Sequence, residues 1–288
     1  MMARSQSHFL PDPFPIPMDR YVVIGNPVSH SFSPAIHARF AAQTGDALEY
    51  GTLLVPLADF AREAARFFES GGAGANVTLP FKVDAFRFAE RSSERARLAG
   101  AANFLARRGN AIEADNTDGA GLVGDLVRNL GVTLRGRSIL LIGAGGAARG
   151  VVAPLLAEQP ARLTIANRTA KRARELARMF ASYGPVDAVA LQSIPETRYD
   201  LVVNATSTST HGETLELPGY VLGDHALAYD MAYGPSARAF IAQARARGAR
   251  ACDGLGMLVE QAAESFRLWR GRTPETGPVL AELRARDA

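Results

Sequence analysis

The chain has 288 residues, enough for two domains, and its 47% hydrophobic and 21% charged residues exclude a disordered or fibrous protein. Its net charge of +3 comes without a basic run, which argues against nucleic-acid and membrane-surface binding, and its single cysteine, Cys252, excludes an internal disulfide. We therefore expect a cytoplasmic protein of ordinary globular type.

The first 17 residues are predicted to form a loose tail. They contain no continuous apolar core, so they resemble neither a signal peptide nor a membrane anchor. Prolines at alternate positions favour extended backbone and cannot donate hydrogen bonds: Pro11, Pro13, Pro15 and Pro17. We expect residues 1–17 to be dispensable for folding and activity.

Between Tyr21 and Asp115 the pattern predicts alternating strands and helices. Ser33 is predicted as the N-cap of the first helix, because Pro34 suits the first helical position. Strands are expected at Tyr21–Ile24, Leu53–Val55, Ala73–Val77 and around Phe104 and Ile112, and the other helices at Phe60–Phe68 and from about Pro80. This alternation predicts a mostly parallel sheet flanked by helices.

A helix from Asp118 to Leu130, ended by Gly131, is predicted to cross into a second alternating series. The strands of that series are expected at Ile139–Ile142, Leu163–Ala166, Val186–Ala190, Leu201–Val203 and Leu227–Asp230. The final stretch is predicted to be helical from Leu258 through Trp269 and again from Pro278, and to pack back on the first lobe.

The strongest local motif is the turn Gly143-Ala144-Gly145-Gly146-Ala147, which directly follows an apolar strand and opens a helix. Glycines there permit a tight turn and bring backbone N–H groups close to a pyrophosphate at the helix N-terminus. The alternative is a purely structural glycine turn. The strand-turn-helix context favours dinucleotide binding.

The end of the next strand indicates which dinucleotide is bound. NAD sites commonly carry an acidic residue there, whereas this chain has Asn167-Arg168-Thr169, with Lys171 just beyond. A guanidinium can bind a 2'-phosphate through paired charge-assisted hydrogen bonds, so the sequence favours NADP. The alternative is a solvated, basic start of a helix.

Two lysines, Lys82 and Lys171, occur among 32 basic residues. A position that keeps lysine against this bias can need an ammonium that loses its proton, although drift is the plain alternative. The first lobe also carries polar residues that suit a small polyhydroxylated anion, each with a bland alternative as a cap, turn or first-turn residue: Ser31, Ser33, Asn76, Thr78, Asn116, Thr117 and Asp118.

Together these motifs resemble the shikimate dehydrogenase family, in order and from Tyr21 to Leu280. The resembling stretches are Gly25-Asn26-Pro27 with Ser29 to Pro34, Gly74 to Lys82, Asp115 to Gly119, the glycine turn, Asn167-Arg168-Thr169, Asn204-Ala205-Thr206-Ser207, Tyr229-Asp230-Met231 and Asp253 to Gln261. The resemblance implies an α/β fold with two lobes. A substrate domain of residues 18–117 plus 254–288 would face a Rossmann-type NADP domain of residues 118–253.

The resemblance also implies site roles. The activity would be reversible NADPH-dependent reduction of 3-dehydroshikimate to shikimate by a monomer or homodimer, with Lys82 and Asp118 as the catalytic pair and no metal ion. Ser31 and Ser33 would bind the substrate carboxylate, and the residues around the ring would be Asn76, Thr78, Asn103, Thr117, Asp118, Tyr233 and Gln261. The cofactor residues would be Glu94, Gly143, Ala144, Gly145, Gly146, Ala147, Asn167, Arg168, Thr169, Lys171, Met231 and Gly254.

The catalytic pair also has a physical rationale of its own. Hydride arriving at a ketone carbon builds negative charge on the oxygen, which a positioned ammonium can stabilise and protonate. Lys82 can do both, and a neighbouring carboxylate would keep it charged and oriented. In the oxidative direction neutral lysine accepts the proton, which arginine cannot do.

Two positions depart from the family pattern, and two other functions remain possible. Phe104 replaces a small polar residue beside Asn103, and Ser209 stands where a glycine is common. The nearer alternative is a quinate/shikimate dehydrogenase with broader substrate choice or NAD use, against which Arg168 speaks. The other is a non-catalytic NADP-binding sensor with the same lobes, which the presence of both Lys82 and Asp118 disfavours.

Overall fold

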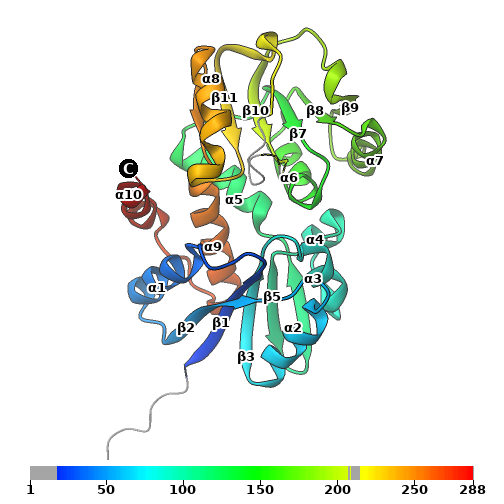
Figure 1. The fold of residues 1–288 in the computed structure, drawn as a ribbon. Helices are drawn as coiled ribbons and strands as arrows, with labels where there is room; N and C mark the ends of the chain where they lie inside the picture. The colour runs from blue at the N-terminus through cyan, green and yellow to red at the C-terminus, as the bar shows by residue number, and fades with distance from the viewer. Residues whose placement is uncertain (1–17, 207, 209–214, 288) are drawn as a thin grey trace, which may run out of the picture.

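The computed structural model describes residues 18–206, 208 and 215–287. The predicted tail of residues 1–17 and the departure at Ser209 lie outside the described residues. Two six-stranded sheets, each flanked by helices, form two lobes that lie one above the other in Figure 1. The predicted α/β class with two lobes and mostly parallel strands is confirmed.

The first sheet has the strand order β2-β1-β3-β5-β6-β4. Its strands are β1 Asp19–Gly25, β2 Leu48–Leu54, β3 Gly72–Val77, β4 Arg91–Ser92, β5 Phe104–Arg108 and β6 Ala111–Asp115. β1 pairs in parallel with β2 and β3, whereas β5 is antiparallel to β3 and β6. Because β1 and β3 are parallel, the segments that follow them meet, and the backbone N–H of Asn26 donates to the carbonyl of Leu79 over 3.1 Å.

The N-terminal part of the chain contributes these helices to the first lobe: α1 Ser33–Thr44, α2 Phe60–Glu69, α3 Lys82–Phe88 and α4 Glu94–Ala99. The prediction of Ser33 as an N-cap was wrong by one residue, because Phe32 occupies the cap position and Ser33 begins α1. The hydroxyl of Ser31 instead accepts the backbone N–H of Ser33 over 3.2 Å. The short elements β4 and α4 escaped the sequence pattern, which needs more than two to six residues to show a period.

The second sheet is parallel throughout, in the order β12-β11-β10-β7-β8-β9. Its strands are β7 Ser138–Ile142, β8 Arg162–Asn167, β9 Val186–Ala190, β10 Tyr199–Asn204, β11 Leu222–Asp230 and β12 Arg250–Cys252. The chain order reverses between β7 and β10, the switch point at which doubly wound sheets bind dinucleotides. The glycine turn directly follows β7.

The helices of the second lobe cover both faces of this sheet. They are α6 Gly146–Ala157, α7 Ala170–Phe180 and α8 Arg238–Ala246, with short 3-10 turns at Leu191–Ser193, Gly219–Val221 and Gly234–Ala237. One face buries Leu141 and Ile165 against α6 and α7, and the other buries Leu140 and Ala228 against α8. Buried on both faces, the strands are almost entirely apolar, as parallel strands commonly are.

Helices α5 Asp118–Gly124 and α9 Leu255–Arg270 run between the lobes in Figure 1. α5 continues as a π-helical turn, Asp125–Asn129, before Gly131 ends it. A Cβ atom on Gly121 would lie 2.8 Å from the carbonyl oxygen of Met257, so α5 and α9 cross at close range.

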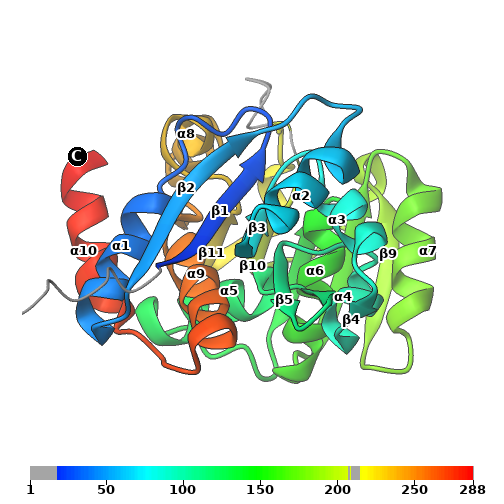
Figure 2. The same ribbon diagram turned by 90° about the horizontal axis from the view of Figure 1, so that it is seen from below.

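The C-terminal part of the chain returns to the first lobe. Phe266 of α9 and Leu283 of the last helix, α10 Thr276–Asp287, pack with Phe40 of α1 in one apolar cluster. α10 lies beside α1 in both Figure 1 and Figure 2. Within the described ranges, no helix combines the length and apolarity needed to cross a membrane.

Candidate active site

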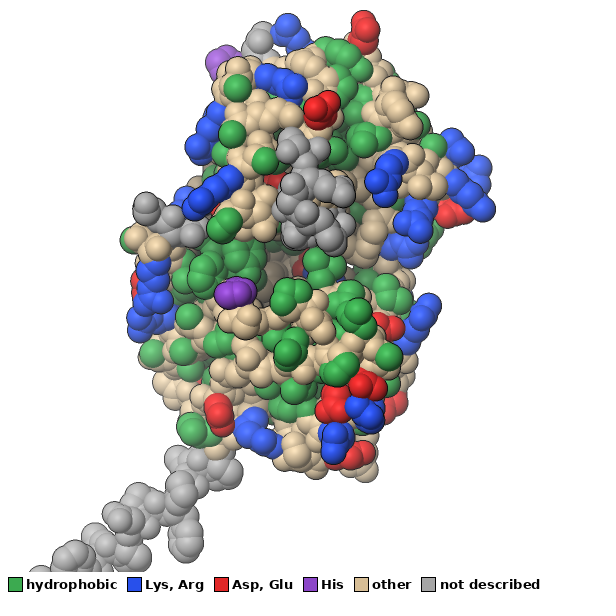
Figure 3. Space-filling view, viewed as in Figure 1, with side chains coloured by type: hydrophobic (Ala, Val, Ile, Leu, Met, Phe, Trp, Pro, Cys, Tyr) green, Lys and Arg blue, Asp and Glu red, His purple; other side chains and the backbone are tan. Residues whose placement is uncertain are grey.

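Lys82 and Asp118 form an ion pair between the first residues of α3 and α5. The Lys82 Nζ lies 2.6 Å from Asp118 Oδ2, and the side chains are 18% and 5% exposed. A charge-assisted hydrogen bond of this length, mostly shielded from water, fixes the ammonium in position. Figure 3 shows the surface hollowed between the two lobes, the region in which the first turn of α5 begins.

A hydrogen-bond network fixes the second carboxylate oxygen of Asp118. Its Oδ1 accepts from Asn103 Nδ2 over 2.9 Å. The same amide nitrogen has two further acceptors, Thr117 Oγ1 at 2.9 Å and Gln261 Oε1 at 3.1 Å, for its two hydrogens. Asn103 Oδ1 in turn accepts the backbone N–H of Thr117 over 2.7 Å. The structure thus brings together five residues that the sequence analysis singled out.

Asn76 belongs to the same network, but its amide is occupied by protein partners. Its Oδ1 accepts the hydroxyl of Tyr50 over 2.7 Å, and its Nδ2 donates to Ser265 Oγ over 2.9 Å. Sequence analysis missed both partners. Ser265 follows Gln261 by four residues and so shares its face of α9, a signal that could have found it. Tyr50 lies on β2 and carries no comparable signal.

Of the remaining predicted substrate residues, Ser33 is the one shown in contact with this network, among the described residues. The side chain of Ser33 contacts Tyr50 and opposes the effect of burial, which raises the pKa of that tyrosine well above its usual value. Thr78 follows β3, and a Cβ on Gly25 would lie 2.5 Å from its methyl group. The ring of Tyr233 lies 5.7 Å from that of Phe32, next to Ser31 and Ser33 in the chain.

The turn that carries Asp118 is also fixed by a half-buried ion pair at Asp115. Arg95 Nη2 lies 2.6 Å from Asp115 Oδ2, and Arg95 Nη1 lies 2.9 Å from Glu264 on α9. Burial alone would raise the pKa of Asp115, but the hydrogen bonds from Arg95 and Ser93 outweigh burial and keep that pKa below its usual value. Sequence analysis did not identify this pair.

The glycine turn fits the pyrophosphate of a dinucleotide. Gly143 has a φ of 122°, and a Cβ there would lie 2.8 Å from the carbonyl of Ala205. Around Gly145 nothing lies within 4 Å of such an atom, so its backbone is open. α6 has no acidic residue in its first turn, which leaves the positive end of the helix dipole available to an anion.

The segment after β8 presents basic groups to solvent. Asn167 Nδ2 donates to the carbonyl of Thr169 over 3.0 Å, closing a turn that exposes Arg168. Lys171 lies on the first turn of α7, is 80% exposed and is 3.9 Å from Glu175. A 2'-phosphate could reach the guanidinium of Arg168 from solvent, whereas no acidic residue occupies the first turn of α7 to compete for it.

Met231 and Gly254 lie against each other at the end of β11. A Cβ on Gly254 would lie 2.4 Å from the carbonyl oxygen of Met231. Glu94, in contrast, is an exposed residue at the start of α4. The glycine turn, Met231 and Gly254 all follow strands of the second sheet on the side of its carboxyl ends.

Phe104, the departure beside Asn103, lies in the core of the first lobe. Its ring stacks on Trp269 at a centroid distance of 5.0 Å and an interplanar angle of 25°. Tyr21 and Ala106 complete this cluster. The phenylalanine at position 104 therefore affects the packing of β5 in the core, whereas the side chain of Asn103 faces Asp118.

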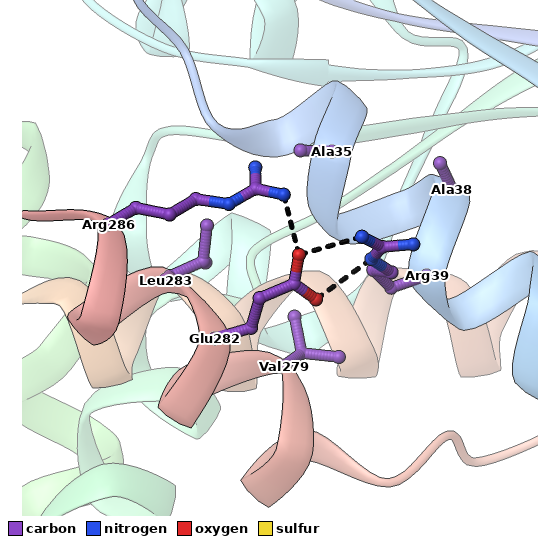
Figure 4. Close-up of a pocket in the computed structure, with 7 residues that line it drawn as sticks. All are labelled: Ala35, Ala38, Arg39, Val279, Glu282, Leu283 and Arg286. Carbon is purple, nitrogen blue, oxygen red and sulfur yellow. Dashed lines mark hydrogen bonds and ion pairs between the residues drawn. The ribbon is translucent and has the colours of Figure 1, made fainter.

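A surface groove of about 180 Å³ lies away from the predicted site, between α1 and α10. Figure 4 shows Glu282 between Arg39 and Arg286, with the apolar side chains of Val279 and Leu283 beside it. In the part of the chain that the structure describes, no group of three or more His, Cys, Asp or Glu side chains is arranged to bind a metal ion.

Comparison with known proteins identifies the family. The family profile described as the shikimate dehydrogenase substrate binding domain matches residues 23–105. The shikimate / quinate 5-dehydrogenase profile matches residues 125–214, and the shikimate 5'-dehydrogenase C-terminal domain matches residues 254–284. The chain belongs to the shikimate dehydrogenase family.

Individual known proteins are similar to this chain over nearly its whole length. The shikimate dehydrogenase (NADP(+)) of Hahella chejuensis is 52% identical over 271 residues, which cover 94% of this chain and 100% of that protein. An Ael1 enzyme from Pseudomonas putida has 46% identity and a TM-score of 0.87, with 92% and 98% covered. Shikimate 5-dehydrogenase from Thermus thermophilus, in complex with NADP(H) and shikimate, has 32% identity and a TM-score of 0.80, with 94% and 100% covered.

Proposed function

We propose that this protein is an NADP-dependent shikimate dehydrogenase, which reduces 3-dehydroshikimate to shikimate reversibly in the pathway to chorismate and the aromatic amino acids. One observation carries the proposal: the mostly buried ion pair of Lys82 and Asp118, 2.6 Å apart. It lies in a family whose relatives at about 50% identity are named for this activity. NADPH, when bound, supplies the hydride that the substrate ketone receives.

Lys82 acts on the substrate oxygen. As the carbonyl carbon is reduced, negative charge develops on that oxygen, and the ammonium stabilises the charge and transfers a proton to it. Asp118 orients the ammonium through its 2.6 Å charge-assisted hydrogen bond. In the reverse direction the neutral amine accepts the hydroxyl proton, and Asp118 stabilises the ammonium that forms.

The substrate is oriented by hydroxyl and amide groups. Ser31 and Ser33 bind its carboxylate at the start of α1. Asn103, Thr117 and Gln261 share hydrogen bonds that a ring hydroxyl can join or replace, because Asn103 has more acceptors than hydrogens. The other ring contacts come from Asn76, Thr78 and Tyr233. A site built of hydrogen-bonding groups rejects analogues that lack the matching hydroxyl.

The second lobe would hold the cofactor. The turn Gly143 to Ala147 would bind the pyrophosphate at the N-terminus of α6, and the 2'-phosphate would be bound by Asn167, Arg168, Thr169 and Lys171. Met231 and Gly254 would border the nicotinamide, with Glu94 on the cofactor side of the first lobe. The guanidinium of Arg168 in place of an acidic residue is the feature that favours NADP over NAD.

The same assignment implies a division of the chain. Residues 18–117 and 254–288 form the substrate domain, and residues 118–253 the NADP domain. The enzyme acts in the cytoplasm as a monomer or homodimer.

The loss of NADPH absorbance with 3-dehydroshikimate tests the activity directly, and a folded preparation without turnover would overturn it. Parallel assays with quinate and with NADH separate it from a quinate/shikimate dehydrogenase.

A further inference from the structure

Asp118 is flanked by two residues that both contact one turn of the dinucleotide-binding helix. Asn116 precedes it by two positions, and Gly119 follows it directly. On α6, the residues that they contact are Gly150 and Pro154, one turn apart. Gly150 follows the first residue of α6 by four positions, so the same helix that begins at the glycine turn contacts one residue on each side of the candidate catalytic carboxylate.

The Asn116 contact is close and leaves the side chain little freedom. A Cβ on Gly150 would lie 2.9 Å from Asn116 Oδ1 and 3.1 Å from its Nδ2. The same Oδ1 accepts the backbone N–H of Asp118 over 3.1 Å, and the Nδ2 donates to the carbonyl of Ala101 over 3.0 Å. Asn116 is 2% exposed, so water could not replace either bond if the amide moved.

The contact of Gly119 with α6 is also close. A Cβ on Gly119 would lie 2.3 Å from Pro154 Cγ and 2.5 Å from the carbonyl oxygen of Gly150. Pro154 has no N–H, so it cannot donate to the Gly150 carbonyl, its normal partner in an α-helix. The oxygen that the proline releases is the one that faces Gly119. The glycine and the proline together let α5 approach α6 at a distance that other residues would forbid.

We propose that the Gly150–Pro154 turn of α6 positions the carboxylate of Asp118, acting through Asn116 and Gly119. The inference rests on the proposed dehydrogenase function. Gly150 and Pro154 are positioning residues, because they act on Asp118 through Asn116 and Gly119. Asp118 is thereby fixed by the helix that binds the cofactor as well as by Asn103, which belongs to the substrate lobe. A small misplacement of a reacting group can reduce the rate about a hundredfold.

Two single variants and their combination test the proposal. Gly150→Ala adds a methyl group that must displace the Asn116 amide, and Asn116→Ala removes that amide without adding bulk. In each folded variant we expect kcat for 3-dehydroshikimate reduction to fall about tenfold or more, with the KM for NADPH within about threefold of wild type. In Gly150→Ala/Asn116→Ala the added methyl group has nothing to displace, so kcat should equal that of Asn116→Ala.

Leu156→Ala is the matched control. Leu156 lies on the same helix but outside the Gly150–Pro154 turn, is buried in the core of the second lobe, and faces Gly184, where a Cβ would lie 3.3 Å from its Cδ2. Its truncation should lower the melting temperature, as cavity-forming variants do, and leave kcat within about twofold of wild type. This variant separates a loss of stability from a loss of positioning.

Each outcome of these measurements either supports or overturns the proposal. The proposal is overturned if folded Asn116→Ala keeps the wild-type kcat, if either variant changes only the KM for NADPH, or if the double variant loses the product of the two single effects. Should Gly150→Ala fail to fold, kcat of Asn116→Ala decides alone. If the wild-type protein turns over 3-dehydroshikimate and these variants match it, only the positioning role is refuted. If the wild-type protein shows no turnover, the proposed function is refuted.

Discussion

Lys82 Nζ and Asp118 Oδ2 lie 2.6 Å apart although the two residues are 36 positions apart in the chain. Each is the first residue of a helix, and each helix follows a strand of the first sheet by way of a short loop. The pair therefore lies on rigid elements. A group that stabilises a developing charge must be held rigidly in position.

Replacement of this lysine should affect the chemical step. Lys82→Ala should lower kcat by about 10² to 10⁴ while KM for 3-dehydroshikimate changes less, because the ammonium acts mainly as charge develops. Steady-state kinetics with NADPH measure both constants. Arg87→Ala, an exposed cation on the same helix, should behave as wild type. A large rise in KM at unchanged kcat would make Lys82 a binding residue instead.

Cofactor choice should depend on Arg168. Arg168→Asp removes the positive charge facing the 2'-phosphate and adds a repulsive carboxylate, so the ratio of kcat/KM for NADPH to that for NADH should fall. Arg178→Asp makes the same charge change on an exposed site in the last turn of α7 and controls for the long-range charge effect. An unchanged ratio in Arg168→Asp would exclude this arginine from the phosphate site.

His37 should make the stability of the protein sensitive to pH. Burial lowers the pKa of His37 to about 3, opposed by the nearby Asn76 amide. The folded pKa lies below the unfolded value of about 6.5, so the unfolded state binds the proton first and stability falls as pH decreases from about 6.5 toward 3. The maximum slope for one group is about 1.4 kcal/mol per pH unit.

The test compares denaturant unfolding of wild type and His37→Phe at pH 7 and pH 5. The phenyl ring retains a partner for Tyr50, on which His37 stacks at a centroid distance of 4.2 Å, but cannot bind a proton. The free energy of unfolding should fall by about 2 kcal/mol more in wild type than in the variant over this interval. Equal losses in the two proteins would show that His37 does not titrate differently on unfolding.

Phe104 should matter for stability and not for catalysis. Phe104→Thr restores the small polar residue of the family pattern but removes a buried ring that stacks on Trp269, and we expect a loss of about 3 kcal/mol in the free energy of unfolding. Below the melting transition, kcat should stay within about twofold of wild type. A large drop in kcat with little loss of stability would place Phe104 in the site after all.

The amino-acid sequence by itself determined the features that depend on neighbours in the chain. The glycine turn after β7, the alternation of strands and helices, and the run of family motifs were all predictable, because turn chemistry and hydrophobic period are local properties. The same locality explains the failures. The elements β4, α4 and β12 are too short to show a period. The N-cap of α1 is Phe32 and not Ser33, and a difference of one residue is below what a local pattern resolves.

The tertiary structure decided what depends on packing between distant segments. Tyr50 and Ser265 join the network around Asn76 only because β2, β3 and α9 meet in the first lobe. Arg95 finds Asp115 and Glu264 on two other elements. Above all, the contacts of Asn116 and Gly119 with α6 arise from a crossing of two helices whose distance is set by the absence of side chains at Gly119 and Gly150. No local pattern encodes such a crossing, because the atoms that meet there belong to segments far apart in the chain and their approach is fixed by the close packing of the whole fold.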